Sequence, residues 1–128
     1  MKVTLIALAA AIAFGGFVTL SRAADDDDAK APITGVLIDQ MCGAKMMSKD
    51  DPQAAAAAHK KACAMKDSCA SSGFAVIQGK HMYKLDDAGA KMAKEYLAKD
   101  DASTMVTVDG TVKEDMIAVK SIKPAAGK

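Results

Sequence analysis

The sequence predicts an α+β fold that is mainly β with two helices. We expect a small five-stranded barrel, or an antiparallel sheet, with a cysteine-containing helical insert after the first strand. Short apolar, β-branched runs bounded by turn residues recur along the chain, as in small β domains. Two other stretches consist of strong helix formers and lack the apolar–polar alternation that is typical of strands. The length of 128 residues and the 51% hydrophobic content suit one small domain.

The first strand is expected at residues 33–39 (ITGVLID), because this run is apolar and β-branched. Residues 41–50 are expected to be irregular. Asp51 is a good N-cap and Pro52 a good first helical residue. Helix formers, five of them consecutive alanines, then fill residues 53–66 and predict the first helix, which forms the insert.

A hairpin is expected next, after Asp67 and Ser68 break the first helix. Its strands cover residues 74–78 and 81–85, and Gly79-Lys80 forms a two-residue turn that begins with glycine. The second and third strands are therefore expected to pair as an antiparallel hairpin.

The second helix is expected over residues 87–99, with Asp86 or Asp87 as its cap. Apolar side chains recur on one face at three- and four-residue spacing, and lysines lie off that face. The apolar face consists of Ala88, Met92, Ala93, Tyr96 and Leu97.

The last two strands are expected at residues 104–112 and 116–122, joined by a turn at 113–115. Gly110 interrupts the alternation of the fourth strand and predicts a bulge or a tight bend there. Five strands with a helix between the third and fourth is the connectivity of an oligonucleotide/oligosaccharide-binding (OB) fold, a closed or partly closed barrel. The alternative is an open antiparallel sheet with two helices on one face.

The N-terminal segment predicts export. A positive start at Met1-Lys2 precedes an almost wholly apolar run. Ser21-Arg22-Ala23 then supplies a small residue at both positions where an A-x-A-type cleavage site needs one. We expect residues 1–23 to be a signal peptide, with an uncleaved membrane anchor as the alternative. An acidic disordered leader would follow at 24–32, then a single OB-fold-like domain at 33–123 and a tail at 124–128. The mature protein is expected to be secreted or periplasmic.

The charge balance gives no reason to expect a nucleic-acid partner. The chain has 17 Lys and Arg against 16 Asp and Glu, and removal of Lys2 and Arg22 with the signal peptide changes the net charge from +1 to −1. Aromatic residues make up 4% of the chain and tryptophan is absent, so base-stacking platforms are not expected either. We also expect no membrane association after signal cleavage.

All three cysteines and one of the two histidines lie within a 28-residue stretch. Three thiols and an imidazole are the ligand set of a tetrahedral Cys3His site for a soft ion such as zinc or copper. An exported chain favours the other interpretation, one disulfide and a spare thiol. Three connectivities are possible, of which Cys42 to Cys63 or to Cys69 would tie the loop to the helix, and free thiols are the remaining alternative. The candidate metal ligands are Cys42, His59, Cys63 and Cys69.

Methionines are numerous, and thioether sulfur binds Cu(I). Those near the cysteines in sequence are Met41, Met46, Met47 and Met65. The alternative role is core filling, because a chain with few aromatic residues needs flexible side chains to complete its core.

Several motifs follow one another along the chain: residues 34–45, His59-x3-Cys63, Cys69, and residues 83–86, 106–112 and 117–122. In this order they resemble a family of small exported bacterial domains of uncharacterised function. The resemblance covers residues 33–122, and it implies a barrel-like β domain more than a function. The family pattern opens with a strand ending in Asp-x-x-Cys-Gly-Ala-Lys, followed by a His-x3-Cys-x3-Cys helix. Here the last two cysteines are separated by five residues, and Met46 stands where such proteins often carry a histidine.

No phosphate-binding glycine loop, Cys-x-x-Cys pair or catalytic metal motif is present in the sequence. We therefore expect a non-enzymatic binding or accessory module of unknown ligand or protein partner, stabilised by the Cys/His cluster. The alternatives are a copper- or zinc-binding protein and a thiol-redox protein.

Overall fold

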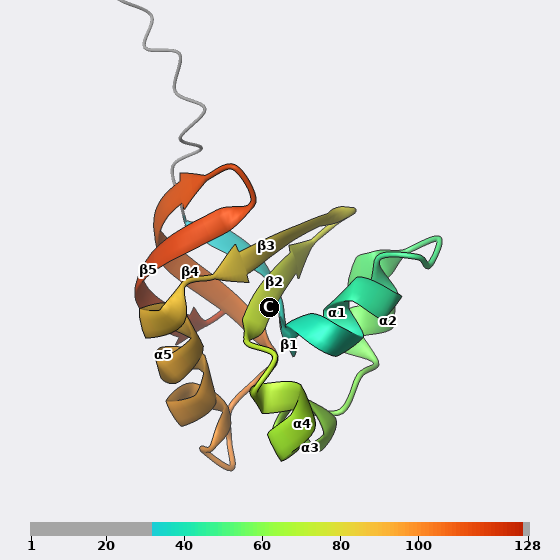
Figure 1. Cartoon of the computed structure of the whole chain (residues 1–128), viewed down its shortest axis with the longest axis horizontal. Coiled ribbons are helices and arrows are strands. Elements are labelled where there is room, and N and C mark those ends of the chain that lie inside the picture. Colours follow the sequence, from blue (N-terminus) through green and yellow to red (C-terminus); the bar gives the residue numbers. More distant parts are fainter. Residues whose placement is uncertain (1–31, 127–128) are drawn as a thin grey trace, which may run out of the picture.

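The predicted strands close into a barrel in the order β1-β2-β3-β5-β4, which confirms the α+β barrel fold class (Figure 1). The computed structural model describes residues 32–126; the predicted signal peptide and nearly all of the predicted leader lie outside them. Neighbouring strands are antiparallel except β3 and β5, which pair in parallel. The strands are β1 (Ile33–Asp39), β2 (Phe74–Gln78), β3 (His81–Leu85), β4 (Met105–Lys113) and β5 (Met116–Pro124).

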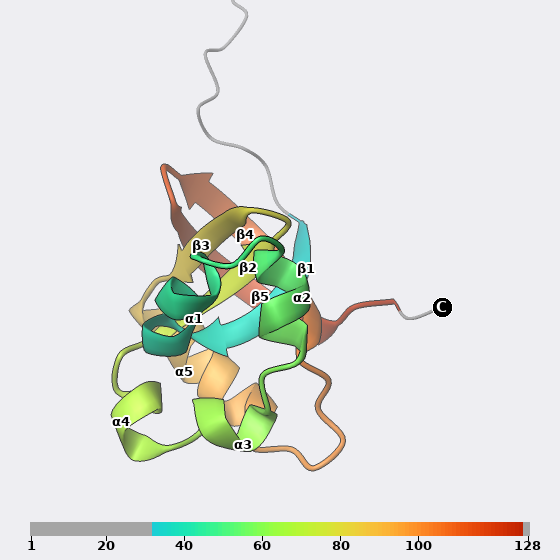
Figure 2. The same ribbon diagram turned by 90° about the vertical axis from the view of Figure 1, so that its right-hand side faces the viewer.

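Four short helices form the insert between β1 and β2, and a longer one joins β3 to β4. Figures 1 and 2 show α1 and α2 beside the β2–β3 hairpin, with α3 and α4 together below them. Among residues 32–126 no helix is both long and apolar enough to span a membrane. The helices are α1 (Gln40–Met46), α2 (Pro52–Ala57), α3 (Lys61–Ala64), α4 (Asp67–Ala70) and α5 (Asp87–Leu97).

The core divides into two clusters, on opposite faces of β1. Leu37 joins the main cluster, which includes Phe74 and Leu97. Val36 and Ile38, which alternate with Leu37 along the strand, belong to a second cluster with Ala56 of α2 and Ile77 of β2. β1 is therefore buried on both faces, which explains its continuous apolar sequence.

The turns and the bulge occur where the sequence predicts them. Gly79 and Lys80 link β2 to β3, and Gly79 has a φ of 58°, a value that glycine adopts without strain. The β4–β5 register shifts between Asp109 and Gly110, which confirms the predicted irregularity. A Cβ at Gly110 would lie 2.2 Å from the Ala118 carbonyl oxygen, so the bulge requires a residue without a side chain.

α5 forms as predicted, capped by Asp86, whose Oδ1 accepts a hydrogen bond of 2.8 Å from the Gly89 amide. Tyr96 and Leu97 are buried, whereas Met92 is half-buried and Ala88 is exposed. The predicted face is therefore correct over the last two turns of the helix, and the prediction was wrong for Ala88.

The structure corrects the expected insert at three points. Residues 40–46 form α1 where an irregular stretch was expected, and residues 67–70 form α4 where a helix break was expected. The single helix expected over 53–66 is split into α2 and α3.

The split of the insert helix has a tertiary cause. Ala56 of α2 packs in the second cluster, whereas Ala64 of α3 packs in the main core. In addition, Nζ of Lys61 donates hydrogen bonds to the carbonyls of Lys99 and Asp100, just after α5. The turn at 58–60 lets both segments reach these separate contacts, although its sequence contains no helix-breaking residue.

Candidate metal centre

Asp39 ends β1 and is fully buried, which is unusual for a carboxylate. It is the N-cap of α1: its Oδ2 accepts a hydrogen bond of 2.8 Å from the backbone amide of Cys42. Its other oxygen, Oδ1, has no hydrogen-bond partner. Asp39 thus fixes the start of the helix that carries Cys42 while half of its carboxylate remains unpaired.

Cys42 lies in the first turn of α1 and is half-buried. The next residue, Gly43, lets α1 lie close to the barrel, because a Cβ there would come within 3.1 Å of Met82 Sδ and 3.2 Å of Ile38 Cγ2. The close approach made possible by Gly43 therefore helps to set the position of the Cys42 thiol.

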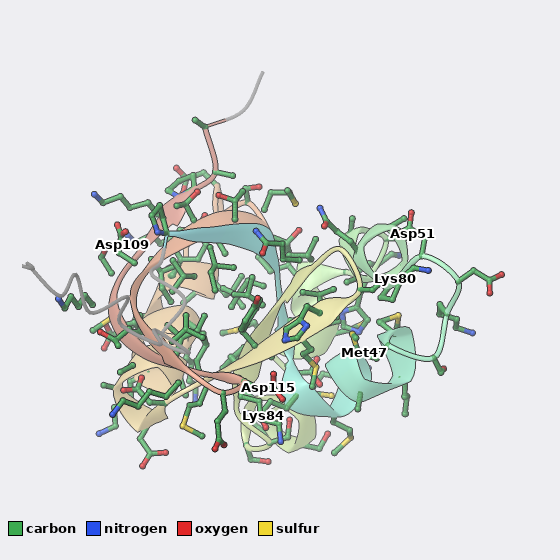
Figure 3. The ribbon with its side chains drawn as sticks, turned by 90° about the horizontal axis from the view of Figure 1, so that it is seen from above. Met47, Asp51, Lys80, Lys84, Asp109 and Asp115 are labelled. Carbon is green, nitrogen blue, oxygen red and sulfur yellow. The ribbon has the colours of Figure 1, made fainter. Side chains whose placement is uncertain are left out.

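His59 comes from the turn between α2 and α3 and is half-buried. Its backbone amide donates to the Ala56 carbonyl at 3.0 Å, just after α2 ends. The helix itself docks on the β2–β3 turn, where Gln53 Oε1 accepts a 2.6 Å hydrogen bond from the Gly79 amide. In Figure 3, Asp51 at the start of α2 accordingly lies near Lys80 in that turn.

A carboxylate oxygen of Asp39, the Cys42 sulfur and a ring nitrogen of His59 all lie within 4.8 Å of one another. They come from the end of a strand, the first turn of a helix and an interhelical turn. Carboxylate, thiolate and imidazole are all zinc ligands, and the thiolate and imidazole also suit copper. The three donors are therefore close enough to converge on a single transition-metal ion.

The environment of Cys42 opposes ionisation of the free thiol. Burial, the negative charge of Asp39, a side-chain hydrogen bond to Asp39 and the neighbouring Cys69 raise the pKa of Cys42 to about 11. A thiol with a raised pKa is a poor nucleophile at neutral pH. Because a metal ion binds the thiolate, an ion at this site would have to displace the Cys42 proton.

The predicted ligands are only partly brought together. Cys42 and His59 converge, and Cys69 adjoins Cys42, but neither Cys63 nor Cys69 belongs to the close group with Asp39. All three cysteines are free in the structure, so it contains no disulfide. Asp39 was not among the ligands predicted from the sequence, although its place at the end of an apolar strand, three residues before a cysteine, was a signal for it.

The methionines that pack beside the site are only partly those that lie near the cysteines in sequence. Met46 and Met47 pack against the second cluster with Cys42, as expected from their positions. Met65 instead packs on the main core, and Met41 is exposed. Met82 and Met105, distant in sequence, complete the group around the second cluster. Their packing fits the core-filling role.

Comparison of the chain with protein-family models, with curated proteins and with solved structures finds no match.

Proposed function

We propose that this chain is an exported, non-enzymatic domain that binds one transition-metal ion through Asp39, Cys42 and His59. The observation that carries the proposal is the fully buried carboxylate of Asp39, which lies beside a thiol and an imidazole and whose Oδ1 has no hydrogen-bond partner. A buried polar atom that lacks a partner costs roughly 1–3 kcal/mol, and more when it is charged. A bound cation would offset that cost.

The donor types select the class of ion. Calcium and magnesium prefer sites made wholly of oxygen atoms, whereas this group supplies one oxygen, one sulfur and one nitrogen. Zinc and copper accept sulfur and nitrogen donors, and zinc also accepts carboxylate. We therefore propose zinc or copper as the bound ion.

The proposed ion would also have a structural effect. Asp39 belongs to the barrel, whereas Cys42 and His59 belong to the insert. An ion bound by all three would fix the insert to the end of β1. This effect agrees with an accessory or binding module that is stabilised by its Cys/His cluster.

The proposal is tested by titrating reduced protein with Zn²⁺, and with Cu(I) under anaerobic conditions, against a competing chelator. We expect one ion per chain. Asp39→Asn and His59→Ala should each weaken binding by at least about tenfold. Loss of a metal ligand should lower the affinity at least as much as loss of a residue that only hydrogen-bonds a ligand. Asn keeps an N-cap acceptor, so Asp39→Asn removes the charge without removing the cap.

The chain offers a matched control for each variant. Asp86 is likewise an N-cap aspartate, and His81 is the other histidine, exposed and paired with Asp115 at 3.0 Å. Asp86→Asn and His81→Ala should leave the metal affinity unchanged. Stoichiometric binding that is equally insensitive to all four variants would show that the ion binds elsewhere.

A further inference from the structure

Cys69 is the third cysteine near the proposed centre, and the chain positions it through a connected set of hydrogen bonds. It is 9% exposed and lies in α4. The Ser72 hydroxyl donates to the Cys69 carbonyl at 2.6 Å and accepts from the Met41 amide at 3.2 Å. The Gln40 amide donates to the Gly73 carbonyl at 2.9 Å. The first turn of α1, which carries Cys42, is thus attached to the end of α4.

This attachment places α1 beside α4, and Cys69 is among the groups that raise the pKa of the Cys42 thiol. Cys63 differs: it lies half-buried in α3 and is not among the groups that act on Cys42. The two remaining cysteines therefore have different relations to the proposed centre.

The coordination chemistry leaves one position to fill. Structural zinc sites are tetrahedral with four protein ligands, and Asp39, Cys42 and His59 supply three. Cys69 stands outside the group of donors that lie within 4.8 Å of one another, yet it is next to Cys42. A cysteine sulfur moves relative to its backbone through χ1 alone, so a role for Cys69 as a ligand requires a χ1 rotamer that directs its sulfur to the shared ion.

Resting on the function proposed above, we propose that Cys69 is the fourth ligand of a closed Zn²⁺ site formed by Asp39, Cys42, His59 and Cys69. Two thiolates, an imidazole and a carboxylate fill the tetrahedron, and no position remains for a reactive water. The site would then hold its ion for structure or storage, and Cys63 would remain a free thiol.

The test uses Co²⁺ as a spectroscopic probe of the reduced, full-length domain without oxygen. Absorption from sulfur-to-cobalt charge transfer grows with the number of bound thiolates. Cys69→Ser should lower this absorption to about half of the wild-type value and weaken Zn²⁺ binding by at least about tenfold. Cys63→Ser is the matched control and should leave both unchanged.

A second measurement needs no variant, which matters if a substitution at buried Cys69 impairs folding. Zn²⁺ should protect Cys42 and Cys69 from alkylation while Cys63 still reacts, and a chelator should restore reactivity at both protected sites. Full charge-transfer absorption in folded Cys69→Ser, or zinc-dependent protection of Cys42 alone, would overturn the fourth-ligand proposal and leave the three-ligand site standing. Protein that binds neither Co²⁺ nor Zn²⁺, and that also fails to bind Cu(I) under anaerobic conditions, would overturn the proposed function as well.

Discussion

At the scale of single residues, Asp39 links folding to the proposed chemistry. One carboxylate oxygen holds the amide of Cys42 and so starts α1, while the other is buried without a partner. Burying a charge is unfavourable unless it is paired, hydrogen-bonded or bound to a metal. A residue needed only to cap a helix could do so at the surface, as exposed Asp51 does for α2. Its burial is therefore what distinguishes Asp39 from an ordinary cap.

Tyr96 gives a prediction about pH at the same scale. Burial is the main cause that raises the pKa of Tyr96, and its hydroxyl donates to the Ser103 carbonyl at 3.0 Å. The folded state therefore holds the hydroxyl proton of Tyr96 more tightly than the unfolded state does. The contribution of protonated Tyr96 to the free energy of unfolding is complete below the unfolded-state pKa of about 10. It is lost as the pH rises through the higher pKa of the folded state.

Urea unfolding between about pH 9 and pH 11 tests this prediction. We expect Tyr96→Phe to lower the free energy of unfolding by about 0.5–1.5 kcal/mol at neutral pH, because the hydrogen bond to Ser103 is lost. Between neutral and alkaline pH, the variant should then lose less stability than the wild-type protein, because it has no hydroxyl to ionise at this position. Tyr83→Phe is the control, since Tyr83 and Tyr96 are the only tyrosines in the chain. The prediction would be contradicted if Tyr96→Phe lost as much of its free energy of unfolding at alkaline pH as the wild-type protein does.

At the scale of elements, α5 closes the main core, with α3 packed on it, and helices α1 and α2 of the insert cover the second cluster. The buried face of α5 contributes Ala93, Tyr96 and Leu97 to the main core, whereas α2 contributes Ala56 to the second cluster. α5 is the longest helix among the described residues, and the insert consists of helices of four to seven residues. Such short helices need tertiary contacts for stability, because isolated helices below about 12–15 residues are marginal in water.

Replacement of Leu97 tests the role of α5. Leu97 is 2% exposed, so Leu97→Ala should lower the free energy of unfolding by about 2–5 kcal/mol through lost burial and a residual cavity. Met116 is 50% exposed, and Met116→Ala should change stability by no more than about 0.5 kcal/mol. Denaturant unfolding of both variants measures the difference. A loss below about 1 kcal/mol for Leu97→Ala would mean that α5 does not close the core as described.

At the scale of the whole molecule, the barrel and the insert meet at the proposed metal centre. The barrel has its own core, and α5 closes it independently of the insert helices α1 and α2. The insert is attached to the barrel by the second cluster, by Ala64 of α3 in the main core, by hydrogen bonds such as that from the Gly79 amide to Gln53, and by the Asp39 cap. An ion at Asp39, Cys42 and His59 would add a further attachment between the two parts.

Metal binding should therefore stabilise the insert more than the barrel. Free Zn²⁺ at 100 times its dissociation constant should add about 2.7 kcal/mol to the free energy of unfolding. Hydrogen exchange with and without Zn²⁺ should show the larger gain in protection at residues 40–70 and a smaller gain in the β4–β5 hairpin. His59→Ala should remove the gain and His81→Ala should retain it. Equal gains throughout the chain would indicate that the ion does not attach the insert locally.

The sequence by itself determined the strands, the turns, the bulge at Gly110 and α5, because their signals lie within a few neighbouring residues. Apolar alternation, the glycine turn at 79 and the aspartate cap at 86 each act locally. It also indicated Cys42 and His59 as candidate ligands, since few residue types bind soft metals.

Only the tertiary structure decided the form of the insert and the composition of the site. α1 forms despite Gly43 because Asp39 caps it and the barrel surface supports it, and the turn at 58–60 forms because Ala56 and Ala64 pack in different clusters. The inclusion of Asp39 and the separate positions of Cys63 and Cys69 depend on how the end of β1 meets the insert. Spacing along the chain cannot specify these positions, because they follow from contacts between segments that fold together.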